Sequence, residues 1–401
     1  MSVLVAIFGL AFLILVHEAG HFVTALAVGM RPRSFNLGFG PPLLKIRIRG
    51  IDYAVRGIPL GGYVKIPGMH RPAASDVDAY FGRGLRDAPE LVGPAERLKR
   101  SLETGDLGQA EAGLADLQAA AERTGAGSLA ERGLRELSDG LGRDAYWRQR
   151  TWRKVAVILA GPGTNALLAV LLFWIVFMTA IGKVTSRIDA VLPDRPAAAV
   201  GLLAGDRIVQ IDGRHVDAID IPNRISSSKG RPLILTVERS GSRVELGPVR
   251  ALEDDDGRYR LGFRLGAEPL GAGESALESL DLTWAVTRET VKSLGRIVHE
   301  EGREQISSPV GIVRESSRAA DEGVERVLGI FGFISLSLAL LNLLPLLPLD
   351  GGHIAFSLIE GIRGRAVARE VYERVSAIGI AVVLLLFFVG LSNDVGRLDG
   401  G

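Results

Sequence analysis

The stretch LVHEAGHF at residues 15–22 places two histidines and a glutamate inside an otherwise apolar segment. His17 and His21 are four residues apart, so on a helix they share one face and can bind the same cation. Glu18 follows the first histidine and can reach a water molecule beside that cation. Neutral imidazoles are good Zn²⁺ ligands, and a carboxylate can accept the proton of a zinc-activated water. The motif therefore predicts a hydrolytic zinc site.

The alternative interpretation is a pair of hydrogen-bonded core histidines. In a chain with six histidines, a chance match to this motif is expected on the order of 0.01 times. Each ionised group within hydrocarbon also costs roughly 2.5 kcal/mol or more. A metal site accounts better for three titratable groups in an apolar segment.

A catalytic zinc needs a third protein ligand and an open position for water. Near the other apolar segments, the candidates are Asp350 and His353 in LLNLLPLLPLDGGHIAF. Pro345 and Pro348 are expected to break the helix, and the glycine pair 351–352 is expected to let the chain turn. This frame favours Asp350 as the ligand, with His353 beside the site. A helix-end carboxylate without a metal is the alternative for Asp350.

Two asparagines also stand in apolar surroundings, Asn165 in AGPGTNALL and Asn342 in LLNLLP. Either side chain could hydrogen-bond a substrate backbone or stabilise an oxyanion. Hydrogen bonding between helices is the alternative for both.

The elements that must position these residues are membrane segments. The chain has 401 residues and is 47% hydrophobic, which is high for a soluble enzyme. Each apolar run is near the ~20 residues that a membrane-spanning helix needs. The runs cover roughly residues 2–28, 155–182, 327–349 and 376–391. The first run has no Lys or Arg before its apolar core and continues past His21, which disfavours a cleaved signal peptide.

Basic residues near the segment ends indicate the orientation. YWRQRTWRK at 146–154 and IRGRAVAREVYER at 362–374 are both predicted to be cytoplasmic, which places both termini and residues 183–325 on the opposite side. The HEAGH motif and Asp350 then lie at similar depth, toward the cytoplasmic leaflet. The net charge of +1 gives no indication of nucleic-acid binding, and the absence of cysteine excludes disulfides and thiolate zinc sites.

The regions between the apolar runs differ in pattern. Residues 33–69 alternate like a β-hairpin close to a membrane segment. Residues 73–145 show helical spacing and predict a soluble insert, favoured as a spacer or packing element. Residues 184–268 predict a compact β-rich domain, and 274–322 include a helix of mixed polarity that could lie on the membrane surface.

In chain order, HEAGH, GFGP, PLGGYVK, AGPGTN, SPVGI and NLLPLLPLDGGH resemble the site-2 protease family of intramembrane zinc metalloproteases. Within this family, the chain most resembles the branch of the bacterial regulator of sigma-E protease. The resemblance covers the chain except for about residues 73–145. It implies that His17, His21 and Asp350 bind zinc and that Glu18 is the catalytic glutamate. Asn342 matches an asparagine that helps to hold substrate.

The resemblance implies an α-helical polytopic membrane protein with about four transmembrane helices, a membrane-associated β-hairpin, a soluble PDZ domain and a helical insert. The expected divisions are a first transmembrane helix at 1–30, a re-entrant hairpin region at 31–72, the insert at 73–150, a second transmembrane helix at 151–182, the PDZ domain at 183–270, amphipathic and linker helices at 271–323, a third transmembrane helix at 324–353, a basic cytoplasmic loop at 354–374 and a fourth transmembrane helix at 375–394.

The function implied is cleavage within the transmembrane segment of single-span membrane proteins such as anti-sigma factors, in regulated intramembrane proteolysis. The lipid bilayer and a peptide or protein ligand of the PDZ domain are the other expected partners, with no nucleic acid. The protein is expected in the cell membrane, with the PDZ domain extracytoplasmic and residues 31–154 and 354–374 cytoplasmic. We further hypothesise that the 44–57 hairpin pairs with an unwound substrate segment.

Three other functions fit the sequence less well, and two features depart from the family pattern. A non-proteolytic scaffold that binds protein C-termini through its PDZ domain would not need the intact HEAGH motif. A soluble zinc protease would need a hydrophilic helix around that motif. A metal transporter would need ligands on more helices. The chain has room for one PDZ domain where the branch often has two. Leu347 also stands where the family usually has proline.

Overall fold

The computed structural model describes residues 2–399, except for 82–84, 86–88, 126, 180–182, 255–256, 297–315, 317–318, 320–322 and 368. The chain forms two compact units. The first comprises Met1–Ala169, Val286–Gly323 and Ile330–Gly401, and the second comprises Val170–Ala285 and Val324–Gly329. The SPVGI motif at 308–312 lies outside the described residues.

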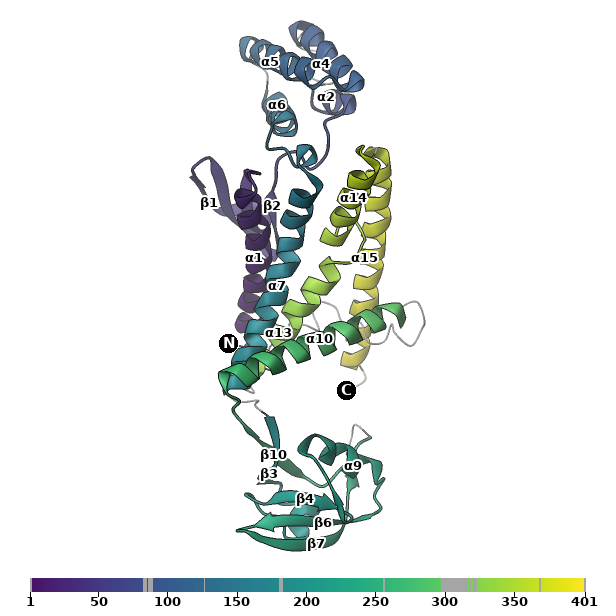
Figure 1. Ribbon diagram of the computed structural model, residues 1–401. Helices are drawn as coiled ribbons and strands as arrows, with labels where there is room; N and C mark the ends of the chain where they lie inside the picture. The colour runs from purple at the N-terminus through teal and green to yellow at the C-terminus, as the bar shows by residue number, and fades with distance from the viewer. Residues whose placement is uncertain are drawn as a thin grey trace. The chain divides into compact units, whose positions relative to one another are not determined.

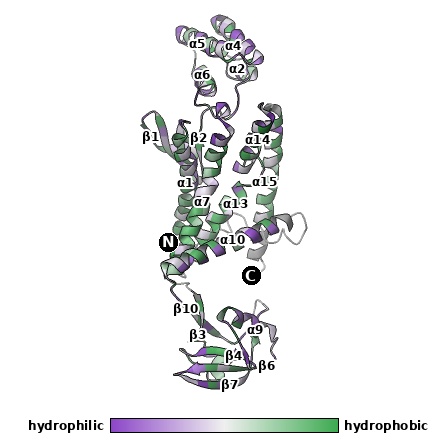
Figure 2. Cartoon of the chain, viewed as in Figure 1, coloured by the Kyte–Doolittle hydropathy of each residue, from purple (hydrophilic) through white to green (hydrophobic). Residues whose placement is uncertain are grey.

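Four of the described helices are long and apolar enough to cross a membrane. They are α1 (Ser2–Ala27), α7 (Thr151–Thr179), α13 (Val324–Asn342) and α15 (Arg369–Asp399). These helices carry long hydrophobic stretches in Figure 2. Many of their apolar side chains, such as Phe8, Leu167 and Leu385, face outward, as expected of helices surrounded by lipid. The expected number of about four spans is therefore matched by the helices of the described residues.

Hydroxyl groups join the first three of these helices. Thr164 Oγ1 of α7 donates to the backbone oxygen of Val16 in α1 at 3.1 Å. Ser335 Oγ of α13 donates to the backbone oxygen of Asn165 in α7 at 2.8 Å. Such short polar side chains let apolar helices pack closely while their own polar atoms stay hydrogen-bonded.

The third transmembrane helix was expected at 324–353, but this segment contains one helix and the start of another. α13 ends at Asn342, and a new helix, α14 (Asp350–Arg363), begins at Asp350 after a break that contains Pro345 and Pro348. The expected loop at 354–374 is accordingly mostly helical, because α14 continues to Arg363 and α15 begins at Arg369.

The glycine pair was expected to turn the chain, and this expectation is wrong. Gly351 and Gly352 are buried in the first turn of α14. A Cβ at Gly351 would lie 2.2 Å from the backbone oxygen of Leu343, and one at Gly352 would lie 2.5 Å from the backbone nitrogen of Leu347. The glycines are needed because the helix packs directly on the preceding backbone. Lys154 Nζ of α7, 3.0 Å from Glu360 Oε2, fixes α14 from the other side.

The hairpin consists of β1 (Ser34–Ile48) and β2 (Ile51–Lys65), which meet at a tight turn where Ile48 lies opposite Ile51. Both strands are long and irregular, so that residues 34–37 pair with 52–55 and also with 62–65. β2 packs against α1 (Figure 1). This arrangement brings the end of β2 next to the helix that carries the HEAGH motif.

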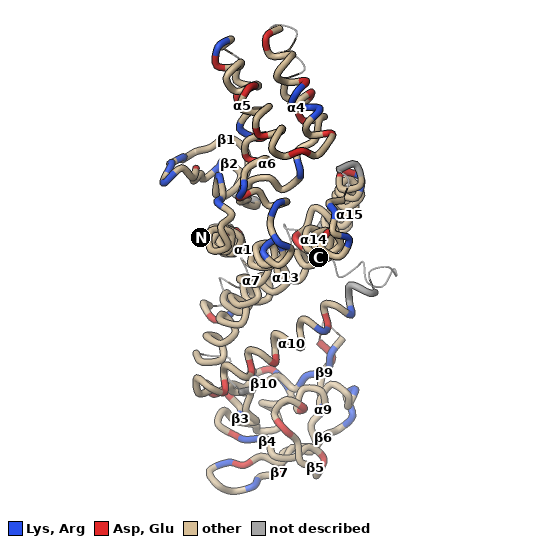
Figure 3. The backbone as a smooth tube through the Cα atoms, turned by 45° about the horizontal axis from the view of Figure 1, so that its top comes forward, with Lys and Arg blue, Asp and Glu red and all other residues tan. Residues whose placement is uncertain are grey.

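The 73–145 region is helical, as its residue spacing predicts. Its helices are α2 (Ala74–Phe81), α4 (Val92–Thr104), α5 (Leu107–Thr124) and α6 (Ser128–Leu141). They share an apolar core that includes Phe81, Leu98 and Leu117, and Figure 3 marks Lys, Arg, Asp and Glu residues along these helices. The two ends of this helical insert lie side by side, because Tyr146 N donates to the backbone oxygen of Pro67 at 2.8 Å.

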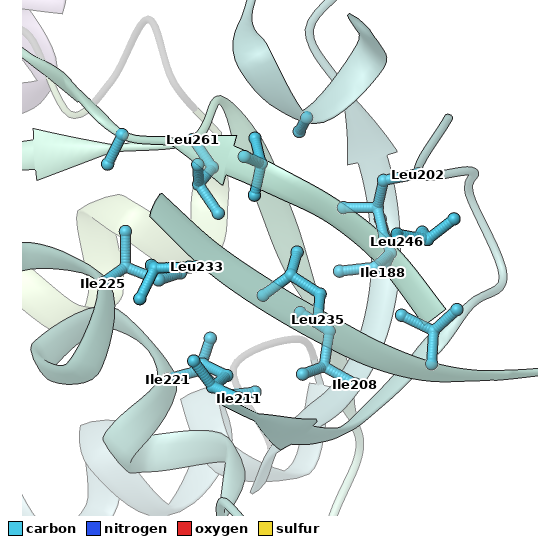
Figure 4. Packing of buried hydrophobic residues seen from close by; sticks show 14 of the residues in the cluster. Ile188, Leu202, Ile208, Ile211, Ile221, Ile225, Leu233, Leu235, Leu246 and Leu261 are labelled. Carbon is cyan, nitrogen blue, oxygen red and sulfur yellow. The ribbon is translucent and has the colours of Figure 1, made fainter. Parts of the chain in front are cut away.

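The second unit is built on a six-stranded sheet in the order β10–β3–β4–β6–β7, with β5 paired to β4. The strands are β3 (Lys183–Val191), β4 (Arg207–Ile211), β5 (Arg214–His215), β6 (Pro232–Arg239), β7 (Ser242–Arg250) and β10 (Phe263–Glu268). β8 (Leu252–Glu253) and β9 (Tyr259–Arg260) form a separate pair. Figure 4 shows the apolar core between this sheet and the short helices α8 (Pro196–Ala199) and α9 (Ile221–Ser227).

α10 (Ala272–Arg296) follows the sheet and begins against the end of α7. Trp174 Nε1 donates to the backbone oxygen of Ala272 at 2.9 Å. Leu277, Leu280 and Trp284 are exposed on this helix, which agrees with its mixed polarity in the sequence.

Candidate metal centre

α1 and α14 bring three donor atoms together. Nε2 of His17 and Nε2 of His21 are 3.3 Å apart, one helical turn from each other. Oδ2 of Asp350 lies 3.1 Å from the first and 3.4 Å from the second. Both histidines are 7% exposed. Among the described residues, this is a group of His and Asp side chains whose ligand atoms all lie close enough to hold one metal ion.

The donor set fits zinc. Ligand atoms held tetrahedrally at zinc bond lengths lie about 3.3 Å from one another, which matches the three observed separations. Oδ2 of Asp350 is buried, and the atoms it faces are the Nε2 atoms of the two histidines, which cannot donate to it when the imidazoles are neutral with the proton on Nδ1. A buried carboxylate oxygen of this kind is costly unless a cation neutralises it. Two imidazoles and a carboxylate are also the ligand types found in catalytic zinc sites that keep a position for water.

α7 supports the site from behind. Nδ1 of His21 lies 2.8 Å from the backbone oxygen of Val157. A hydrogen bond from Nδ1–H to this carbonyl leaves Nε2 free to bind a metal. Gly161 faces the same ring, and a Cβ there would lie 2.2 Å from His21 Nε2. The first glycine of AGPGTN therefore leaves room for the ligand atom.

Glu18 lies beside the three donors but does not belong to them. Its carboxylate accepts a hydrogen bond from the backbone of Val64 in β2. Gly62 packs on the same side chain, and a Cβ there would lie 2.9 Å from Glu18 Cγ. The end of β2 thus holds Glu18 next to the metal centre without occupying its carboxylate fully, because a carboxylate has several acceptor positions.

The site opens into a cavity of about 410 Å³. Its walls include the donors, Glu18, Asn342, His353 and residues 61–64 of β2. The 44–57 hairpin was hypothesised to pair with substrate; the β2 residues among the described lining residues of the cavity are 61–64. The reason is the double pairing of the hairpin, which leaves 62–65 as an edge beside α1.

The other predicted residues divide into two groups. Asn342 lines the cavity, as substrate contact requires. Asn165 is fully buried and is not among the described cavity-lining residues; its amide lies 3.5 Å from Nδ1 of His17. His353 lines the cavity, with Nδ1 2.5 Å from the hydroxyl of Tyr372, and stays outside the donor group.

Sequence reasoning missed the roles of Val157, Gly161 and Gly62. Gly62 lies in PLGGYVK and Gly161 in AGPGTN, motifs whose glycines had no chemical role predicted from the sequence. Glycines in these motifs are a signal of close approach, but the sequence alone does not say which side chain approaches.

Two histidines on a helix long enough to span a membrane converge with an aspartate and have a glutamate beside them, which defines a candidate membrane metallohydrolase site. Residues 5–386 match the model of Peptidase family M50, and the chain belongs to this family. It is therefore a zinc-dependent metalloendopeptidase of the site-2 protease type and a multi-pass membrane protein.

Similar proteins carry consistent names. A candidate zinc metalloprotease of Rhizobium meliloti is 30% identical over 416 residues, which cover 98% of this chain and 96% of that protein. Zinc metalloprotease RasP of Bacillus licheniformis is 29% identical, with 96% of both chains covered. Zinc metalloprotease RasP of Geobacillus kaustophilus is 28% identical, with 96% of this chain and 95% of that protein covered. The RasP relatives place the chain near the regulator of sigma-E protease branch.

Proposed function

We propose that this metalloprotease hydrolyses a peptide bond within the transmembrane segment of single-span membrane proteins. In this proposal His17, His21 and Asp350 hold the zinc ion, and Glu18 is the general base. The observation that carries it is the position of His17 and His21 within the apolar span Val3–Ala27, where they meet Asp350 of α14 beside an open cavity. A peptide that is itself in the membrane has access to such a site.

Each residue has a separate part in the chemistry. Zinc, when bound, supplies a Lewis acid that lowers the pKa of water and polarises the scissile carbonyl. Glu18 accepts the proton of the attacking water and passes it to the leaving amine. The Val64 backbone and Gly62 keep the Glu18 carboxylate at the cavity wall for both transfers. Asn342 is proposed to hydrogen-bond the substrate backbone from the cavity wall.

A transmembrane substrate must be unwound locally, because its peptide groups are hydrogen-bonded within their own helix. We propose that residues 61–64 of β2 receive the unwound segment by strand addition. Main-chain hydrogen bonding of this kind would hold an extended peptide across the cavity. It also satisfies the backbone polar groups of the substrate in an apolar environment.

The remaining parts of the proposal concern location and partners. Anti-sigma factors are the proposed class of substrate, and the cell membrane is the proposed location. Residues 183–270 are proposed as an extracytoplasmic PDZ domain with a peptide or protein ligand. A compact sheet with two short helices is consistent with this, and the basic residues around 146–154 and 362–374 support cytoplasmic loops on the other side.

The test is cleavage of a single-span model substrate by purified protein in detergent or liposomes. Glu18→Gln keeps the side-chain shape and removes the base, so cleavage should fall by about 100-fold or more. Zinc content should stay that of the wild type, because Glu18 is outside the donor group. Cleavage at the wild-type rate by Glu18→Gln would contradict the proposed mechanism.

A further inference from the structure

Asn165 is a buried amide that the proposed mechanism does not use. It lies in α7, is 0% exposed, and has its Nδ2 atom 3.5 Å from Nδ1 of His17. Its Oδ1 atom is buried and has no hydrogen-bond partner among the described residues. A buried amide oxygen without a partner is costly, so its surroundings need an explanation.

The protonation of His17 supplies that explanation. Nε2 of His17 is the atom that converges with His21 and Asp350, so Nδ1 carries the proton when the ring binds a metal. A protonated Nδ1 is a donor and needs an acceptor, which an amide nitrogen cannot be. A half turn of the Asn165 amide about its Cβ–Cγ bond exchanges its oxygen and nitrogen. The oxygen then faces Nδ1, and both unsatisfied groups are paired by one rotation.

The other imidazole already shows the same arrangement. Nδ1 of His21 pairs with the backbone oxygen of Val157, also in α7, at 2.8 Å. α7 thus presents one acceptor behind each histidine, a main-chain oxygen for His21 and a side-chain oxygen for His17. Partners of this kind fix the ring orientation and raise the basicity of the ligand nitrogen.

We propose that Asn165 is a positioning residue, whose side-chain oxygen accepts a hydrogen bond from Nδ1 of His17 and directs Nε2 toward the metal. The inference rests on the zinc site proposed above. Contact with substrate is not its role, since the side chain is not among the described residues of the cavity wall. Packing between helices does not require the amide either, because Ser335 of α13 binds the backbone oxygen of Asn165.

The experiment measures zinc affinity in full-length protein in detergent, by competition with a chromophoric chelator. Asn165→Leu removes the acceptor and should weaken zinc binding by about 10- to 100-fold. Asn165→Asp keeps an oxygen acceptor and should restore affinity close to that of the wild type. Ser335→Ala removes the neighbouring hydrogen bond between helices and should leave affinity unchanged. If Asn165→Leu does not accumulate, Asn165→Ala, which adds no bulk, serves in its place.

Two outcomes overturn the inference. Wild-type zinc affinity in Asn165→Leu or Asn165→Ala shows that the orientation of the His17 ring does not depend on the amide. Equal weakening by Asn165→Leu, Asn165→Asp and Ser335→Ala shows a packing effect instead of hydrogen bonding. Asp350→Ala separates this from the proposed function, because zinc retained by Asp350→Ala refutes the zinc site itself. Zinc lost from Asp350→Ala and kept by Asn165→Leu refutes the positioning role alone.

Discussion

Two aspartates of this chain, the buried Asp206 and the half-buried Asp350 with its buried Oδ2 atom, have opposite surroundings. Both oxygens of Asp206 in the β-domain are hydrogen-bonded: Arg239 donates to each at 2.7 Å, and the backbone nitrogen of Leu203 donates to Oδ2 at 2.9 Å. Oδ2 of Asp350 has no such partner among the described residues and faces two imidazole nitrogens. A buried carboxylate is stable in either case only if its charge is compensated. The chain supplies the compensation for Asp206, and a metal ion is proposed to supply it for Asp350.

The largest expected effect separates two glycines of α7. Gly161→Ala places a Cβ 2.2 Å from Nε2 of His21, where the metal ligand atom must be. Zinc affinity should fall by about 100-fold or more, as a displaced ligand costs at least as much as a lost supporting residue. Gly163→Ala, two residues away, meets nothing within 4 Å and is the matched control. Equal zinc content in both variants would show that zinc binding does not depend on Nε2 of His21 at its place beside Gly161.

A smaller effect is expected at the cavity wall. Gly62→Ala should push on Glu18 and on the backbone oxygen of Asn36, which lie 2.9 and 3.0 Å from the added Cβ. Displacing the base by about 1 Å can cost on the order of 100-fold in rate, so cleavage should fall 10- to 100-fold. Zinc content should not change, which distinguishes Glu18, the carboxylate proposed to move protons, from Asp350, the one proposed to bind metal.

The control for this variant lies in the same strand. Gly57→Ala meets only the backbone oxygen of Pro41, at 3.9 Å, and should cleave substrate like the wild type. Equal loss of activity in both variants would point to general damage to the hairpin.

The smallest effect is expected at Asp206. Its hydrogen bonds to Arg239 lower the pKa of its carboxyl group, so the charged form is favoured in the folded domain. The stabilisation is complete above the unfolded-state pKa of about 3.9 and is lost as pH falls through the lower folded-state pKa. Asp206→Asn should therefore cost about 2 kcal/mol of local stability at pH 7. Amide hydrogen exchange over residues 203–211 measures this.

The pH dependence is the decisive part of that measurement. The difference between the wild type and Asp206→Asn should shrink as the pH is lowered toward 3, because protonation removes the same charge as the substitution. A difference that stays constant over this range would mean that the carboxylate charge does not stabilise the domain.

The sequence is informative where the chain repeats a regular pattern. The spacing of His17 and His21 predicts a shared helix face because α1 is unbroken from Ser2 to Ala27. Long apolar runs likewise predict membrane-spanning helices, because each run is a regular local pattern. Asp350 follows a break in the chain, so its approach to α1 depends on packing that no local pattern encodes. The Pro and Gly frame around Asp350 and the resemblance to a family together favour it over His353.

What sequence reasoning could not provide was contact between distant elements. That residues 61–64 and not 44–57 are among the described lining residues of the cavity follows from the double pairing of β1 and β2, which is a tertiary property. The close packing of Gly351 on Leu343 likewise depends on how α14 returns to the end of α13. A glycine in the sequence indicates either a turn or a close approach, and the fold decides between them.

The most direct test of the zinc site compares zinc content in purified wild type and three variants. The account predicts that Asp350→Ala loses the zinc ion, whereas His353→Ala and Asp206→Asn bind it like the wild type. Asp350 belongs to the donor group, whereas His353 lines the same cavity outside that group and Asp206 lies in the β-domain. Zinc retained by Asp350→Ala, or lost from His353→Ala with Asp350 intact, would contradict the proposed His17, His21 and Asp350 site.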